Sequence, residues 1–185
     1  MAQIDISARI IGDTELAAAL ARLSSHDIPK AIAYGVRIAA RGGKAAIGKQ
    51  VSARYAIGSR RVGKDVSDPT FGPGGLTAIL RTSRKPPTAM QFRPKETRKG
   101  LAFTQIKGER TVIKSGFIAK GLTFRREGKA RMPLSVIHGP SLHAIYTGGR
   151  FASEIQSATE ERISEQLVKG ILQKLGKLDA GYGRA

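Results

Sequence analysis

Apolar positions in the first third of the chain predict a long helix with a face of small side chains. From about Ile28 to Ala53, apolar and small residues recur at spacings of three and four, the period of one helix face. This face contains Ile32, Val36, Ala39, Ala40, Gly43, Ile47 and Val51. Because these side chains are mostly small, another backbone can approach the helix closely. Gly42 and Gly43 each weaken a helix by about 1 kcal/mol, so we expect a bend there.

Shorter elements are predicted on either side of this helix. Apolar and polar residues alternate from Gln3 to Ile11, as in a half-buried strand. Asp13 or Thr14 can cap a following helix, and a further short helix is expected from Ser59 to Val66. The apolar face of the first of these helices contains Leu16, Ala19, Leu20 and Leu23.

Strands dominate from Leu76 to Ile137. Residues 68–75, DPTFGPGG, are rich in turn formers and are a poor candidate for regular structure. Residues 84–100 are basic and interrupted by prolines, which leaves two alternatives: a mobile loop, or an edge that becomes ordered on assembly. The expected strands are 76–82, 101–106, 111–114, 116–119, 122–126 and 134–137.

The pattern becomes helical again near the C-terminus. After Gly139-Pro140, Ser141 is a suitable N-cap for a short helical turn that reaches Tyr146. A final helix begins at Phe151, with glutamates in its first half and lysines in its second, an order that suits the helix dipole. We expect residues 179–185 to be frayed. The apolar face of the last helix contains Ile155, Thr159, Ile163, Leu167, Ile171 and Leu175.

These elements predict an α+β fold in which long N-terminal helices and a C-terminal helix pack on a mostly antiparallel sheet. A chain of 185 residues suits a single domain spanning residues 1–185. Within it we expect an N-terminal strand and helices in 1–67, a basic β-sheet region in 76–137 and the C-terminal helix in 151–178.

Charge adds the first functional indication. The chain has a formal net charge of +18. Between Arg81 and Arg131, 15 Lys and Arg stand against three acids, which leaves +12. Such an imbalance is usually compensated by a polyanion or by an acidic protein surface. There is no cysteine, which excludes disulfides and thiolate metal sites. We expect no secretory signal at the start, no membrane span, and synthesis in a cytoplasm.

The strongest candidate for a binding site is the basic hairpin formed by Arg125, Arg126, Lys129 and Arg131. Two interpretations of this hairpin are open. It is either a contact site for DNA phosphates or an acidic protein neighbour, or simply a solvated hairpin tip. Arginine suits bidentate pairing with phosphate or carboxylate. No row of aromatic residues accompanies it, so any DNA contact is expected to involve the backbone and to depend strongly on salt.

Candidate chemistry is otherwise sparse, and we expect no catalytic residue, metal or cofactor. His138 and His143 lack further ligands nearby for a metal. Ser141 has no G-x-S-x-G elbow around it, and the glycines at 72, 74 and 75 are not followed by the GK[ST] of a phosphate loop.

The order of several motifs resembles the phage minor tail protein Z family, also called tail completion proteins. The N-terminal helices and the segments KPPTAMQF, ETRKGLAF, SGFIA and FRREGKARMPL appear in the family's order. The most specific part is the spacing of Arg126, Gly128, Arg131 and Pro133, followed by Gly139-Pro140-Ser141. The loop DPTFGPGG and the tail GYGRA have no counterpart in that pattern.

The resemblance implies a structural protein of a long-tailed bacteriophage virion. It would act as a hexameric ring at the head-proximal end of the tail, where a completed tail joins a filled head. Expected partners are the tail terminator, a head-side connector, the tape-measure protein and the phosphate backbone of the genome. In such a ring the helix face with Arg37, Arg41 and Lys44 would line the lumen, although an exposed, solvated face is the more common role for such residues.

Two alternatives stay open at this point. A tail terminator protein would share the same architecture, and a sequence-independent DNA-binding protein used in packaging would explain the charge. A nuclease needs grouped carboxylates, which the strand-rich half hardly provides.

Overall fold

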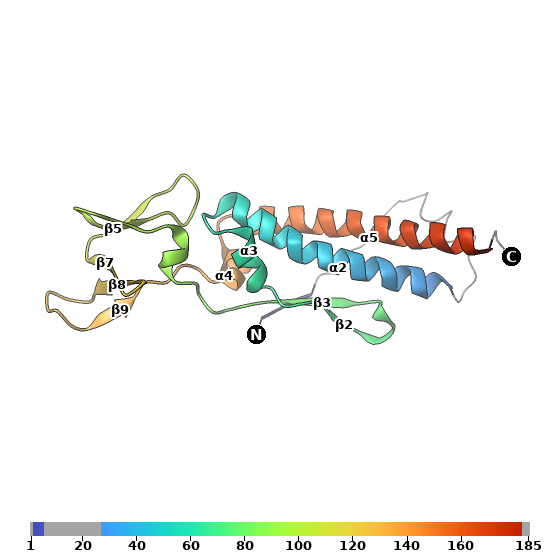
Figure 1. The fold of residues 1–185 in the computed structure, drawn as a ribbon, viewed down its shortest axis with the longest axis horizontal. Coiled ribbons are helices and arrows are strands. Elements are labelled where there is room, and N and C mark those ends of the chain that lie inside the picture. The colour runs from blue at the N-terminus through green and yellow to red at the C-terminus, as the bar shows by residue number, and fades with distance from the viewer. Residues whose placement is uncertain (1, 6–26, 183–185) are drawn as a thin grey trace.

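The structure, a computed structural model, describes residues 2–5 and 27–182. The molecule is elongated, with a pair of long helices at one end and two small sheets at the other (Figure 1). It contains both helices and antiparallel sheets, so the predicted α+β class is confirmed. The predicted helix with Leu16 and Leu23 lies outside the described residues.

The helical half is built on α2 (Asp27–Arg54) and α5 (Ala152–Tyr182), which run antiparallel along each other (Figure 1). A close approach of the α5 backbone is found at Gly35, a position beside the predicted small-residue face. A Cβ added there would lie 2.5 Å from Cγ1 of Ile171 and 2.9 Å from the carbonyl oxygen of Leu167. All six apolar-face residues predicted for the last helix are buried.

α2 continues as one helix through Gly42 and Gly43, and both glycines pack against α5. An added Cβ at Gly43 would lie 3.0 Å from Ile163, and tertiary packing of this kind outweighs helix propensity. The prediction of a frayed end was wrong for residues 179–182, since α5 extends to Tyr182.

A small sheet lies along α2 and has the strand order β1-β3-β2. β3 (Ala78–Thr82) pairs antiparallel with β1 (Ala2–Asp5) and with β2 (Thr70–Phe71). The loop assignment for 68–75 was therefore wrong in part. Thr70 and Phe71 pair with Ile79 and Ala78, and a 3-10 turn, η1 (Pro73–Gly75), completes the hairpin.

Two further three-stranded antiparallel sheets form the other end of the molecule. One contains β4 (Lys95–Thr97), β5 (Gly100–Phe103) and β6 (Thr111–Ile113), and the other contains β7 (Gly116–Ala119), β8 (Leu122–Arg126) and β9 (Leu134–Val136). The sheets pack where β7 meets β5, since a Cβ on Gly116 would lie 2.7 Å from Cβ of Leu101. The predicted strands are present, but in separate small sheets.

The core connects the two halves. One cluster of buried side chains extends from Ile47 and Val51 of α2 to Leu101 and Phe103 of β5. Between them lie the short helices α3 (Ser59–Lys64) and α4 (Leu142–Gly148) and the 3-10 turn η2 (Ala89–Phe92). Phe92 is fully buried. The interpretation of 84–100 as a mobile loop was therefore wrong, because this segment supplies Phe92 to the core and β4 to a sheet.

Candidate interaction surface

The basic hairpin is the connection between β8 and β9 at the end of the molecule farthest from the long helices (Figure 1). We call residues 125–134 the basic tip. Every residue in it is exposed. The backbone N–H of Glu127 donates to the carbonyl oxygen of Pro133 at 3.4 Å and draws the loop together.

The four cations of the basic tip have different surroundings. Nε of Arg125 donates to Oγ of Ser135 at 3.1 Å, and the guanidinium of Arg126 lies over the ring of Phe117 at 5.6 Å. Lys129 and Arg131 have no ion pair or hydrogen bond to the described residues. Two cations are thus oriented by the sheet, and two are free to meet a partner.

Apolar side chains accompany this charge. Met132 in the basic tip is 67% exposed, more than any other large apolar residue in the described chain, and Leu134 is 36% exposed. On the same side of the sheet, by strand register, Phe117 stacks on Phe124 with ring centroids 5.9 Å apart. The tip is therefore both cationic and apolar.

The second group of candidates lies on the helical half. Arg37 is exposed and stands over the ring of Phe71 at 6.0 Å, and Arg41 is exposed on the next turn. Nζ of Lys44 lies 2.8 Å from Oδ1 of Asp68, and this hydrogen bond lowers the pKa of Asp68. This group lies on α2 in the helical half, whereas the basic tip lies at the other end of the molecule (Figure 1).

The family-motif residues divide into two kinds. Gly139 is required by packing, because an added Cβ would lie 2.2 Å from the buried ring of Phe92. Oγ of Ser141 accepts from the backbone N–H of Ala144 at 3.1 Å, so its predicted role as N-cap of α4 is confirmed. Pro140 precedes this cap and is half-buried. Gly128, in contrast, has open space around its Cα position.

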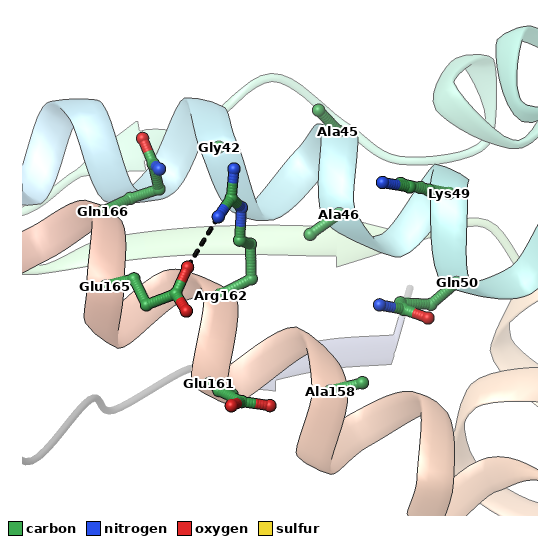
Figure 2. A pocket seen from close by; sticks show the side chains of 10 residues that line it. All are labelled: Gly42, Ala45, Ala46, Lys49, Gln50, Ala158, Glu161, Arg162, Glu165 and Gln166. Carbon is green, nitrogen blue, oxygen red and sulfur yellow. Dashed lines mark hydrogen bonds and ion pairs between the residues drawn. The ribbon is translucent and has the colours of Figure 1, made fainter.

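Sequence reasoning missed a groove between α2 and α5 (Figure 2). Its volume is about 530 Å³. Small residues of both helices line it, and so do two acidic side chains, Glu161 and Glu165, and two basic ones, Lys49 and Arg162 (Figure 2). The small residues are Gly42, Ala45, Ala46 and Ala158. The sequence pattern accounts for Glu161 and Glu165 only through the helix dipole, and the α2 residues of the groove lie outside the predicted small-residue face.

Other chemistry is limited in the described part of the chain. Its residues contain no group of three His, Cys, Asp or Glu side chains placed to hold a metal ion. His138 is exposed and forms an isolated β-bridge with Thr88, whereas Nδ1 of His143 is buried without a hydrogen-bond partner. None of the helices in residues 27–182 is long and apolar enough to cross a membrane.

Comparison with known proteins agrees with the order of motifs in the chain. Neither the curated proteins nor the solved structures contain a match. The sequence model of prophage minor tail protein Z (GPZ) matches residues 12–178, which include α2, most of α5, all strands from β2 onward and the basic tip. The chain therefore belongs to the prophage minor tail protein Z family.

Proposed function

We propose that this protein is a structural, non-catalytic component of a long-tailed phage virion. It completes the tail by forming a ring at the head-proximal end, and this ring enables the tail to join a filled head. The observation that carries the proposal is the family match over residues 12–178.

The surfaces of the molecule suit a role in assembly. The basic tip and the basic face of α2 lie in different regions, so one copy can contact two neighbours at once (Figure 1). The proposed neighbours are further copies in a hexameric ring, the tail terminator, a head-side connector and the tape-measure protein. A net charge of +18 also suits a contact with the phosphate backbone of the genome end.

The first test is a phage that lacks this protein. We expect tails of normal length to accumulate beside filled heads, and added purified protein to restore joining. Cryo-electron microscopy of the complemented particle is expected to show the chain as a ring between tail tube and head. Tails that join normally without the protein would contradict the proposal.

The same experiment separates the two alternatives. A tail terminator stops polymerisation of the tail tube, so its loss would give tails of uncontrolled length. A DNA-binding packaging factor would be absent from the finished particle, and its loss would leave heads unfilled. The large basic excess in residues 81–131 is the observation that keeps the packaging factor as a second candidate.

A further inference from the structure

The basic tip carries apolar surface that nothing in the described chain covers. Met132 is 67% exposed and Leu134 is 36% exposed, and neither belongs to a buried cluster. Lys129 and Arg131 both precede Met132 in sequence and have no ion pair among the described residues. A protein partner for this tip needs an apolar recess with acidic groups at its edge.

The groove between α2 and α5 has these features on its α5 side, whereas Lys49 of α2 lines the opposite side (Figure 2). Its small side chains, among them Ala45, Ala46 and Ala158, leave room for a larger side chain. Residues 151–166 contain four glutamates and a single arginine, so this stretch is acidic in a chain that is otherwise strongly basic. Glu161 and Glu165 stand at the groove and are exposed, and Arg162 pairs with Glu165 at 2.6 Å (Figure 2).

One copy cannot bring these two surfaces together. The basic tip projects from β8 and β9 at one end of the molecule, whereas the groove lies along the helix pair (Figure 1). We propose that the basic tip of one copy docks in the α2–α5 groove of a second copy, with Met132 in the recess and Lys129 and Arg131 beside Glu161 and Glu165. The contact is head-to-tail, so repeated contacts either close into a ring or extend into a filament.

A second copy fits the tip better than DNA does. A phosphate backbone has no apolar surface for Met132 and Leu134. Arg125 is bonded to Ser135, and Arg126 lies over Phe117, so these two side chains are held against the sheet while keeping their charge. On the α5 side of the groove, Glu161 and Glu165 lie beside small residues, and this combination complements both features of the tip.

This inference deepens the proposed function and rests on its ring, because it names the surfaces through which copies meet. Its test uses the absence of cysteine from the chain. Met132→Cys and Ala158→Cys are introduced together into the full chain, which is then oxidised at high protein concentration. We expect a ladder of disulfide-linked oligomers that the Ala158→Cys variant alone does not form. Met132→Cys with Ala45→Cys is a second pair, in which both native side chains are exposed.

Charge reversal then tests the specificity of the contact. Glu161→Lys with Glu165→Lys, or Lys129→Glu with Arg131→Glu, is expected to reduce cross-linking about tenfold. Combining the two reversals is expected to restore it. Lys107→Glu with Arg110→Glu is a matched control, since these exposed residues lie outside both surfaces and are expected to leave the ladder unchanged. Circular dichroism checks that each variant keeps its helices.

Each outcome has a distinct meaning. Absence of a ladder with both cysteine pairs, or a ladder that charge reversal leaves unchanged, overturns the docking contact. If the wild-type protein still sediments as an oligomer in that case, the ring stands but uses another surface. If reversal at the tip abolishes binding to double-stranded DNA but not the ladder, the tip is a DNA contact and the inference is wrong. Failure of the proposed function would appear separately, as normal head–tail joining in the phage that lacks the protein.

Discussion

Gly35→Ala tests the most tightly packed point between α2 and α5. In an isolated helix this change would stabilise by about 1 kcal/mol, because alanine is the better helix former. In this protein the new Cβ would lie 2.5 Å from Cγ1 of Ile171 and 2.9 Å from the carbonyl oxygen of Leu167. Both distances are below van der Waals contact, and the second neighbour is backbone that cannot rotate away.

The expected result is a net loss of stability. Overpacking a core by a methyl group costs about 1–3 kcal/mol, and a backbone neighbour places this site near the upper end of that range. Subtracting the gain in helix propensity leaves a loss of about 2 kcal/mol. For a chain of this size that corresponds to a fall in Tm of about 4–8 °C.

Urea unfolding followed by circular dichroism measures this loss, and Gly176→Ala in α5 is its matched control. Gly176 is helical and exposed, and an added Cβ would meet no atom within 4 Å, so alanine there is expected to stabilise by about 1 kcal/mol. Adding Ile171→Ala removes one clashing atom and should reduce the penalty of Gly35→Ala by about 1 kcal/mol. The packing argument is refuted if Gly35→Ala is as stable as the wild type.

Three further predictions use the same unfolding measurement. Ser141→Ala removes the N-cap bond to Ala144 and is expected to lower the free energy of unfolding by about 1 kcal/mol, whereas Ser141→Gly should lower it by only a few tenths. Equal losses of stability in the two variants would exclude capping as the cause. Gly139→Ala forces a Cβ against the buried Phe92 ring and is expected to cost about 2–3 kcal/mol, while Gly148→Ala, with no atom within 4 Å, should cost nothing. Burial raises the pKa of Tyr146 above the ordinary tyrosine value of 10.0 because the neutral phenol is favoured in the folded protein. The stability that Tyr146 contributes is therefore complete below about pH 10 and is lost as pH rises through the raised pKa; Tyr146→Phe should flatten that loss, and an unchanged pH profile would contradict it.

The sequence predicted most of the helical half because its signals are local and periodic. The i+4 row of the last helix and the small residues of α2 each repeat over several turns. The first row is buried throughout, and the α2 face is buried from Ala39 to Val51 but only half-buried at Ile32 and Val36. The N-cap at Ser141 was also predictable, because a capping side chain bonds to a backbone group only three residues away. Elements with short-range patterns of this kind can be predicted without knowing which distant residues pack against them.

Predictions failed where long-range pairing decided the structure. Nothing within DPTFGPGG shows that Thr70 and Phe71 pair with β3, because the partner strand lies in another segment. Residues 84–100 contain three prolines and resemble a loop, yet Phe92 is fully buried against Gly139 from another part of the chain. The α2–α5 groove was missed for the same reason, since its small and acidic residues come from helices more than 100 residues apart.

The buried cluster that joins the two halves bears on the proposed ring. A head-to-tail contact closes into a ring only if the angle between the two contact surfaces of one copy is fixed. The basic tip and the α2–α5 groove are connected through a continuous cluster in which Ile47, Phe92 and Phe103 pack together. Loosening that cluster should widen the range of angles, so Gly139→Ala is expected to broaden the distribution of cross-linked oligomers without removing the contact itself. A charge reversal at the tip is expected to reduce the total amount of cross-linking without broadening the distribution of oligomers, because it weakens the contact and leaves the angle unchanged.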